Sequence, residues 1–288
     1  MTILLTGATG FIGFNLLKRL CHEQFEIIAL IRNNFGIFQN YINSNNCKLY
    51  DLNVVSLKDI FLFNKNKIDI IIHCAVSVSN DNFKVLDTNI KFSLDLFQEA
   101  MKNDIIFMNL DTTSYNYRNN LYSISKKIFR KIILELNFNK VINLPIEIVY
   151  GKNENRNRFV SSIIYDLLDD KSIKITEGVQ KRNFIYIEDL VSAIILILKK
   201  IDIISKENNE IYLASDDTLQ IKEVVLLLKE LIGGEGEILF GEIPYTDNEK
   251  NDTKVNNKFL KKLGWRQGTA LRQGFLNMIN EIKRRKYD

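Results

Sequence analysis

Short apolar runs and longer amphipathic stretches alternate along the first half of the chain. The apolar runs lie at 3–5, 26–31, 69–73, 105–108 and 140–144. Runs of this length without polar alternation are typical of strands that are buried on both faces of a parallel sheet. The stretches between them carry apolar residues at helical spacing, most clearly in a long helix predicted over 83–101. This order predicts an α/β fold, in which helices cover both faces of a doubly wound parallel sheet.

A glycine-rich segment separates the first predicted strand from the first predicted helix. Three glycines at these spacings allow a tight turn, a close approach to a pyrophosphate, and close packing of the helix on the strand. The free amides at the start of the helix would then face the phosphate charge. A tight turn that merely needs small residues is the simpler alternative. We expect a Rossmann domain that binds a dinucleotide through Gly7, Thr9, Gly10, Phe11, Ile12 and Gly13.

The pattern changes after residue 150, where polar loops become longer. Further amphipathic helices are predicted at 159–168, 189–199, 220–231 and 271–283, and short strands at 184–187 and 237–240. We therefore expect a dinucleotide-binding domain over 1–150, to which 183–213 returns. Residues 151–182 and 214–288 are expected to form a smaller C-terminal α/β lobe that binds the substrate.

Composition narrows the range of partners. The net charge of +4 is modest, and the only dense basic cluster is at 283–286, so nucleic-acid binding is not expected. Three cysteines and two histidines without metal-type spacing favour neither disulfides nor a metal site. The longest apolar run, 191–198, is too short to cross a membrane. Because the first strand begins at the N-terminus with no signal peptide before it, we expect a cytoplasmic protein.

The end of the second strand bears on the choice of cofactor. Sites that prefer NAD usually place an acidic residue there, which binds the adenosine ribose 2′-hydroxyl. This strand is instead followed by Arg32. An arginine fork suits the 2′-phosphate of NADP, although a solvated surface arginine is the simpler alternative. NADP(H) is therefore the expected cofactor, with NAD(H) as the alternative.

Tyr122 and Lys126 are candidates for acid–base chemistry. Their spacing of four places them on one face of a helix. An ammonium group near a phenol stabilises the phenolate, which brings the tyrosine pKa closer to neutrality. The same lysine can hold the nicotinamide ribose. We expect both residues to be catalytic and to contact the cofactor; an ordinary tyrosine and a surface lysine are the alternative.

Several motifs in this order resemble the extended short-chain dehydrogenase/reductase family, the NAD-dependent epimerase/dehydratase group that acts on nucleotide sugars. They are TGxxGxxG at 6–13, Asp51-Leu52, His73-Cys74-Ala75, Asn89, YxxxK at 122–126, 149–151 and RNFIYIED at 182–189. The resemblance implies that Asp51, Leu52, Ala75 and Asn89 lie at the cofactor. It also implies that Arg182 binds the diphosphate of the substrate.

The family also supplies a serine or threonine hydroxyl that bonds to the reacting oxygen. Its usual register, four residues before a tyrosine, falls here on Asp111. An ionised carboxylate cannot donate a hydrogen bond to a carbonyl. A shift of one residue gives the role to Thr112, our choice, with Thr113 as the alternative; both are expected to contact substrate.

Two departures from the family pattern favour one reaction. The acid pair of the family's dehydratases is absent, since Thr112 and Thr113 follow Asp111. The loop at 115–122 is also short, as in the 4-keto reductases of the CDP-abequose and CDP-paratose synthase type. The resemblance therefore implies an NADPH-dependent reductase of a nucleotide-linked 4-keto-deoxy sugar, used in surface-polysaccharide synthesis. It further implies a homodimer formed through the helix that carries Tyr122.

Two other functions stay open at this point. A nucleotide-sugar 4-epimerase would use the same residues with a tightly bound NAD. A non-catalytic NADP-binding sensor would need only the glycine turn, and the intact YxxxK motif counts against it.

Overall fold

A six-stranded sheet is the largest element of the protein. The computed structural model describes residues 1–32, 46–207, 210–246 and 248–287. The strands of this sheet are β1 (Thr2–Thr6), β2 (Glu26–Ile31), β3 (Cys47–Asp51), β4 (Ile70–His73), β5 (Ile106–Thr112) and β6 (Val141–Ile146). Their order is β3-β2-β1-β4-β5-β6, with parallel pairing on both sides of β1. The order reverses at β1, as in Rossmann folds, so the predicted fold class is confirmed.

The chain divides into two compact units. Unit 1 comprises Met1–Tyr115, Asn119–Pro145 and Ile195–Ile211, and unit 2 comprises Asn116–Arg118, Ile146–Ile194 and Tyr212–Asp288. The helices of unit 1 are α1 (Phe11–His22), α3 (Leu57–Phe63), α4 (Asn82–Leu86), α5 (Ser93–Lys102), α6 (Leu121–Glu135) and α9 (Ile201–Glu207), together with the last residues of α8 (Ile187–Lys199).

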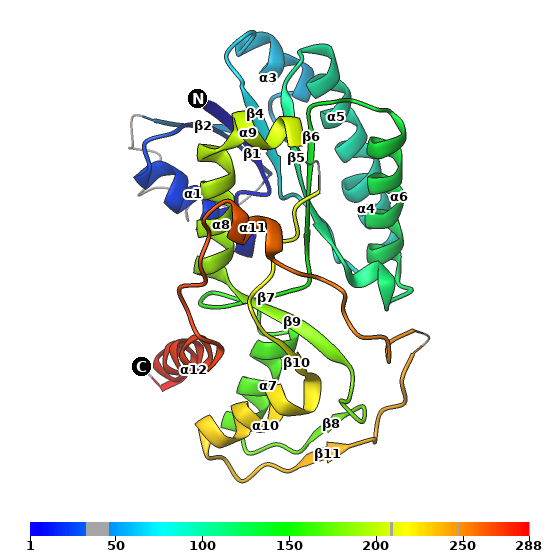
Figure 1. Cartoon of the computed structure of the whole chain (residues 1–288), viewed down its shortest axis with the longest axis vertical. Coiled ribbons are helices and arrows are strands. Elements are labelled where there is room, and N and C mark those ends of the chain that lie inside the picture. Colours follow the sequence, from blue (N-terminus) through cyan, green and yellow to red (C-terminus); the bar gives the residue numbers. More distant parts are fainter. Residues whose placement is uncertain (33–45, 208–209, 247, 288) are drawn as a thin grey trace. The chain divides into compact units, whose positions relative to one another are not determined.

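Helices cover both faces of the unit 1 sheet (Figure 1). On one face α3, α5 and α6 bury a cluster that includes Leu4, Phe97 and Phe129. On the other face α1 packs against β1 and β2, and Lys199 forms an ion pair of 2.6 Å with Glu23. Because both faces are covered, the strands contain few polar residues, which is why they stand out in the sequence.

The helix predicted over 83–101 is interrupted in its middle. A π-helical turn at Asp87–Phe92 connects α4 to α5. A π turn contains one more residue than an α turn, and such turns often lie at functional sites. Its sequence does not break the apolar spacing, so the pattern gave no sign of it. The expected single helix is therefore three consecutive helical segments.

Unit 2 is a smaller α/β assembly. Its strands are β7 (Ile148–Tyr150), β8 (Ile173–Ile175), β9 (Lys181–Tyr186), β10 (Thr218–Gln220) and β11 (Ile238–Phe240), arranged as sheets β10-β9-β7 and β11-β8. Its helices are α7 (Phe159–Leu168), α10 (Ile221–Ile232), α11 (Lys258–Lys262), α12 (Leu271–Tyr287) and most of α8. Trp265 lies in its core, where the indole Nε1 donates a 3.0 Å hydrogen bond to Ser192. Within the described ranges, none of the helices has the length and apolarity needed to cross a bilayer.

Candidate active site

The glycine turn lies between the buried strand β1 and helix α1. Gly7 adopts a φ of +67°, and its carbonyl accepts a 2.9 Å hydrogen bond from the Gly10 amide. A Cβ on Gly7 would lie 2.6 Å from the Ala75 amide nitrogen, and a Cβ on Gly13 would overlap the Gly7 carbonyl group. Both residues must therefore be glycine for the turn to pack. Gly10 is exposed instead, so its missing side chain leaves the turn open to an outside group.

The first turn of α1 fits an anionic ligand. Gly10 caps the helix without a side-chain hydrogen bond, and the turn has no acidic residue. By helix geometry the amides of Phe11, Ile12 and Gly13 have no acceptor within α1. Their dipoles point at the space beside Gly10, where a phosphate group would be stabilised. The residues present therefore fit the pyrophosphate of a dinucleotide. Thr9 lies in the same turn, half-buried.

A buried histidine ties the glycine turn to the end of β4. His73 accepts a 2.8 Å hydrogen bond at Nδ1 from the Thr6 hydroxyl, which itself accepts one from the Ala75 amide at 3.1 Å. Its Nε2 bonds at 2.8 Å to Ser93, whose hydroxyl donates to the Thr88 carbonyl. Burial, and then the charge of a nearby lysine, lower the pKa of His73 to about 3. The neutral imidazole thus holds Ala75 beside the turn, a role that the sequence motif did not specify.

Asn89 links the segment after β4 to helix α6. It lies in the π-helical turn, where its carboxamide oxygen accepts a 2.7 Å hydrogen bond from the Ser77 amide. Its nitrogen donates to the Ser77 carbonyl and to the Ser125 hydroxyl, both at 3.0 Å. Ser125 in turn donates to the carbonyl of Tyr122. Asn89, which was predicted to contact the cofactor, therefore helps to fix the backbone at Tyr122, the candidate catalytic tyrosine.

Arg32 follows β2 at the carboxyl end of the sheet. Its Nη1 lies 3.4 Å from the Thr88 hydroxyl, and its guanidinium lies 5.2 Å from the centre of the Phe92 ring. The residue is half-buried. These contacts hold the cation at the edge where the second strand of a Rossmann domain meets the adenosine ribose.

Asp51 and Leu52 end the neighbouring strand β3. The Leu52 amide donates a 2.8 Å hydrogen bond to the Ile31 carbonyl, which places both residues next to the end of β2. The Asp51 carboxylate accepts a 2.9 Å hydrogen bond from the Asn53 amide and so closes its own turn. Both residues are half-buried at the same edge as Arg32.

Tyr122 and Lys126 lie on the first turns of α6. Asn120 caps this helix by accepting a hydrogen bond from an amide of the first turn. Lys126 is buried, and its Nζ donates a 2.6 Å hydrogen bond to the Leu110 carbonyl. Burial lowers the pKa of Lys126, while the charge of Asp111 opposes that change. Tyr122 is half-buried one helical turn away, so the structure brings the predicted pair onto one face of one helix.

Three buried hydroxyls lie at the end of β5. Thr112 ends the strand, and its hydroxyl oxygen accepts a 3.1 Å hydrogen bond from the Ser114 amide. The Thr113 hydroxyl is buried and has no partner among the described residues. Ser114 bonds through its own hydroxyl to Ser123 of α6 at 2.9 Å. Both candidate threonines thus lie beside the start of the helix that carries Tyr122, and each keeps a hydroxyl proton to donate.

Asp111 belongs to a separate buried network. One carboxylate oxygen accepts a 2.9 Å hydrogen bond from Asn143 and lies 3.5 Å from the Arg130 guanidinium. Tyr115 also donates to it at 3.4 Å, and Arg130 pairs with Glu210. Burial raises the pKa of Asp111. The acid at the family's hydroxyl position therefore serves packing inside unit 1, and sequence reasoning had no signal for its partners.

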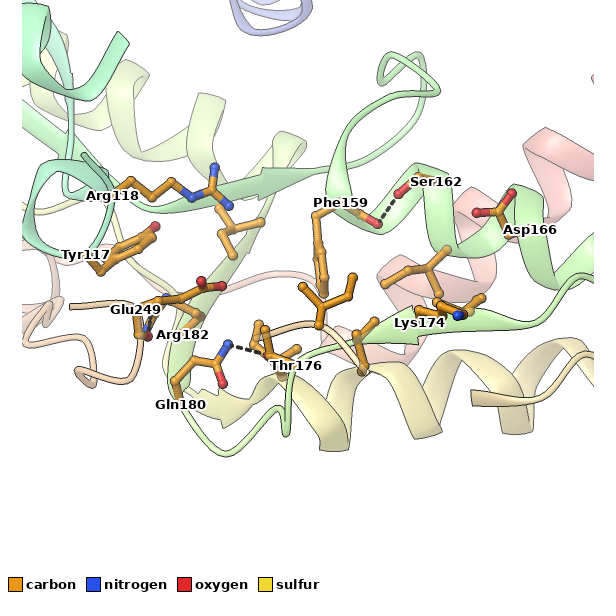
Figure 2. A pocket seen from close by; sticks show the side chains of 16 residues that line it. Tyr117, Arg118, Phe159, Ser162, Asp166, Lys174, Thr176, Gln180, Arg182 and Glu249 are labelled. Atoms are coloured by element: carbon orange, nitrogen blue, oxygen red, sulfur yellow. Dashed lines mark hydrogen bonds between the residues drawn. The ribbon is translucent and has the colours of Figure 1, made fainter. Parts of the chain in front are cut away.

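Unit 2 contains a cavity of about 340 Å³. Figure 2 shows its apolar middle, which includes Phe159, and a polar side chain group at each end. Asp166 and Lys174 lie at one end. Tyr117, Arg118 and Arg182 lie at the other, called here the cationic end. Cavities of this size are typical of small-molecule sites.

Arg182 is buried in the wall of the cationic end. Its Nη1 donates hydrogen bonds to the carbonyls of Lys181 and Asn251, at 2.8 and 2.7 Å, and its Nη2 donates to the Glu249 carbonyl at 2.7 Å. The guanidinium also stacks on the Tyr117 ring, 3.9 Å from its centre. The structure thus places the predicted diphosphate residue at a cavity, with most of its donors already bonded to the protein.

Glu147 lies beside this arginine. One carboxylate oxygen accepts a 2.6 Å hydrogen bond from the Asn183 amide, and the other lies 3.9 Å from Arg182 Nε. Burial raises the pKa of Glu147 to about 7, although the Asn183 bond and the neighbouring cations oppose this. The charge of this wall therefore changes with pH near neutrality.

Residues 3–213 match the model of the NAD dependent epimerase/dehydratase family. The chain belongs to this family. The match spans β1 to the residues just before β10 and includes every predicted cofactor and catalytic residue. The resemblance inferred from the motifs is therefore confirmed.

Several known proteins are similar to this chain over almost its full length. CDP-abequose synthase of Salmonella muenchen is 28% identical and is matched over 96% of this chain and 97% of its own. A putative UDP-glucose 4-epimerase of Methanocaldococcus jannaschii is 22% identical over 98% of both chains. Among solved structures, UDP-glucuronic acid 4-epimerase from Bacillus cereus, crystallised with UDP-glucuronic acid and NAD, superposes with a TM-score of 0.80 at 19% identity over 99% of both chains. The epimerase structure supports the fold of the whole chain.

Proposed function

We propose that this family member is an NADPH-dependent reductase of a nucleotide-linked 4-keto-deoxy sugar, and that its product serves surface-polysaccharide synthesis. The observation that carries the proposal is the full-length similarity to CDP-abequose synthase. The intact Tyr122–Lys126 pair, with Lys126 buried and anchored, supports an oxidoreductase. The residues after Asp111 lack the acid pair of the family's dehydratases, which supports reduction over dehydration.

In the proposed reaction a ketone becomes a secondary alcohol. NADPH, when bound, would supply the hydride for carbon 4. Tyr122 donates the proton that the carbonyl oxygen needs as negative charge develops on it. The Lys126 ammonium stabilises the resulting phenolate, because opposite charges at short range favour the charged form. Thr112 would orient the carbonyl oxygen by donating a hydrogen bond, with Thr113 as the second candidate.

The glycine turn and the cavity of unit 2 are the proposed binding sites. The amides after Gly10 would hold the cofactor pyrophosphate, and Ala75, Asn89, Asp51 and Leu52 would form the rest of that site. The cavity of unit 2 would hold the nucleotide of the substrate, with the diphosphate at its cationic end. Hydride transfer from a cofactor to a sugar requires one binding site for each of them.

The proposal is tested by measuring NADPH oxidation with CDP-, dTDP-, UDP- and GDP-linked 4-keto-6-deoxy sugars, and by determining the product by NMR. A reductase consumes NADPH in proportion to sugar and yields an alcohol at carbon 4. If the purified protein instead retains NAD through gel filtration and interconverts 4-hydroxy epimers without reductant, it is a 4-epimerase. If nucleotide binds but no sugar turns over, the sensor alternative holds.

Arg32 is expected to set the preference for NADPH. Replacing it with alanine removes a cation that would pair with the 2′-phosphate. We expect kcat/KM for NADPH to fall about tenfold, the size of one partly solvated charge-assisted hydrogen bond, with the value for NADH unchanged. Arg19→Ala, which removes an exposed arginine paired with Glu23, is the matched control. Equal loss with both cofactors would contradict this role.

We also propose a homodimer formed through α4 and α6. Phe83 and Leu86 of α4 are 84% and 40% exposed, and Ile124 and Ile128 of α6 are 37% and 44% exposed. The two helices are neighbours, and exposed apolar side chains on adjacent helices often mark an interface. Light scattering after size exclusion is expected to give twice the chain mass, and Phe83→Glu to shift it toward the monomer. A wild-type monomer would refute the dimer.

A further inference from the structure

Two of the three cysteines of the chain lie next to each other in unit 1. Cys21 lies in the last turn of α1, and Cys47 begins the edge strand β3. Both are free thiols, and the side chain of Cys21 is in hydrogen-bond contact with that of Cys47. They are far apart in the sequence, so the fold alone makes them a pair. Neither residue belongs to the cofactor or substrate sites described above.

The backbone around both cysteines holds them in this position. The side-chain nitrogen of Asn46 donates hydrogen bonds to the carbonyls of Cys21 and Phe25, at 3.3 and 3.0 Å. The Asn46 carbonyl accepts a 2.8 Å hydrogen bond from the Ile27 amide. Ile27 in turn pairs with Cys47 in the sheet. The residue before Cys47 therefore ties the start of β3 both to the end of α1 and to β2.

Strand alternation places the Cys47 side chain on the face of the sheet that α1 covers. Tyr50, also in β3, belongs to the cluster that α3 and α5 bury on the opposite face. Successive strand residues point to opposite faces, so Cys47, three positions before Tyr50, points the other way. Helix α1 packs against β1 and β2 on that side. The contact between the two thiols thus follows from the strand register and the helix packing.

A pocket at the amino ends of β1, β2 and β3 gives access to Cys47. Its volume is about 410 Å³, and Cys47 is one of its lining residues. The described part of its lining has two lysines, Lys48 and Lys67, and one acid, Glu26. A reagent with carboxylate groups therefore meets no excess of negative charge there. The pocket lies at the opposite edge of the sheet from the glycine turn, which follows the carboxyl end of β1.

We propose that Cys21 and Cys47 are a dithiol site, which a small disulfide such as oxidised glutathione converts to an intramolecular disulfide bond. The Cys47 thiolate attacks one sulfur of the reagent, a mixed disulfide forms, and one reagent thiol leaves with the proton that Cys47 gave up. Cys21 then attacks the Cys47 sulfur, and the second reagent thiol leaves with the Cys21 proton. The protein loses two electrons and two protons, and the reagent is reduced to two thiols.

The surroundings of Cys47 set the rate of this exchange. Its hydrogen bond to Cys21 and its burial raise the pKa of the Cys47 thiol. The thiolate that must attack is therefore scarce at neutral pH, and we expect the first step to take hours. The second step joins sulfur atoms that are already in contact, so the mixed disulfide should not accumulate. The resulting bond ties α1 to β3 and stabilises unit 1 chiefly by restricting the unfolded chain.

The test treats the whole protein with oxidised glutathione for several hours under native conditions, blocks the remaining thiols, and maps the tryptic peptides by mass spectrometry. Cys21 lies in peptide 20–32 and Cys47 in peptide 33–48, so digestion separates them unless a disulfide joins them. We expect the joined peptides, with Cys74 labelled by the blocking reagent. The melting temperature should rise by about 5–10 °C, and dithiothreitol should reverse both changes.

Two variants separate the steps. Cys21→Ser is expected to stop with glutathione bound to Cys47 and with no rise in melting temperature. Cys74→Ser is the matched control, because this thiol takes part in neither step, and it should give the joined peptides as the wild type does. The inference is wrong if the wild-type protein keeps three free thiols, or if glutathione attaches to Cys21 or Cys74 while Cys47 stays free. The wild-type result decides this even if a variant fails to fold, and it does not depend on the proposed reaction.

Discussion

Tyr122→Phe is expected to lower NADPH oxidation by about a hundred- to ten-thousandfold, the range that a positioned general acid contributes. The phenol is the proposed proton donor, and phenylalanine keeps its shape and packing but has no proton to give. Because Lys126 is anchored on the Leu110 carbonyl, it cannot move to replace the missing hydroxyl without losing a buried hydrogen bond. The measurement is kcat with saturating NADPH and the best keto sugar.

Two controls make the Tyr122 result interpretable. Affinity for NADPH should stay within a few-fold of wild type, because the backbone of Tyr122 still accepts its hydrogen bond from Ser125. Tyr165→Phe removes a phenol of unit 2 and should retain full activity. If Tyr122→Phe keeps wild-type kcat, the tyrosine is not the acid, and Thr113, with its buried unpartnered hydroxyl, becomes the next residue to test.

Gly13→Val is expected to abolish measurable dinucleotide binding and to destabilise unit 1. The new side chain would overlap the carbonyl of Gly7 and press on Ala8, whose Cα lies 3.1 Å from the added Cβ. Overpacking of this kind costs about 1–3 kcal/mol of the free energy of unfolding. The turn can relieve it only by moving the amides of α1 away from the phosphate position. Thermal melting and NADPH titration report the two effects.

Gly10→Ala is the matched variant for the same turn. Its added Cβ would approach only the Gly7 carbonyl oxygen, at 3.2 Å, and Gly10 has a φ of −79° that alanine adopts freely. We expect a nearly unchanged melting temperature with weakened NADPH binding, since the exposed methyl occupies the approach to the amides. Unchanged binding in both variants would show that the dinucleotide does not use this turn.

Buried parallel strands and local motifs were readable from the sequence. Five of the six strands of unit 1 are largely apolar because they are covered on both faces, so their runs needed no tertiary information. The sixth, β3, is an edge strand in which only Tyr50 is buried, and it gave no such run. The glycine turn and the spacing of Tyr122 and Lys126 are local, and the structure places them as expected. The three-residue strands β7, β8 and β10 were missed because each is too short to show a periodicity, and only long-range pairing defines it.

The remaining parts of the site depend on contacts between distant residues. Thr6, His73 and Ser93 form one hydrogen-bonded chain although 67 and 20 positions separate the bonded pairs. Arg182 likewise donates hydrogen bonds to carbonyls that lie 67 and 69 positions away in the sequence. Motif matching assigned Arg182 a ligand, and its role stays a prediction. The fold decides which side-chain donors stay free to bind a ligand, and the spacing of residues in the sequence does not show this.

Because of the π-helical turn at Asp87–Phe92, the position of Asn89 depends more on the number of residues between α4 and α5 than on which apolar residues they are. One residue fewer would restore regular α-helical spacing and would rotate the preceding segment by about 100° around the helix axis. The helix would survive, but the carboxamide of Asn89 would turn away from Ser77 and Ser125. A one-residue deletion here would therefore disconnect the segment after β4 from helix α6 while leaving the core almost untouched, whereas most apolar exchanges along the run would not.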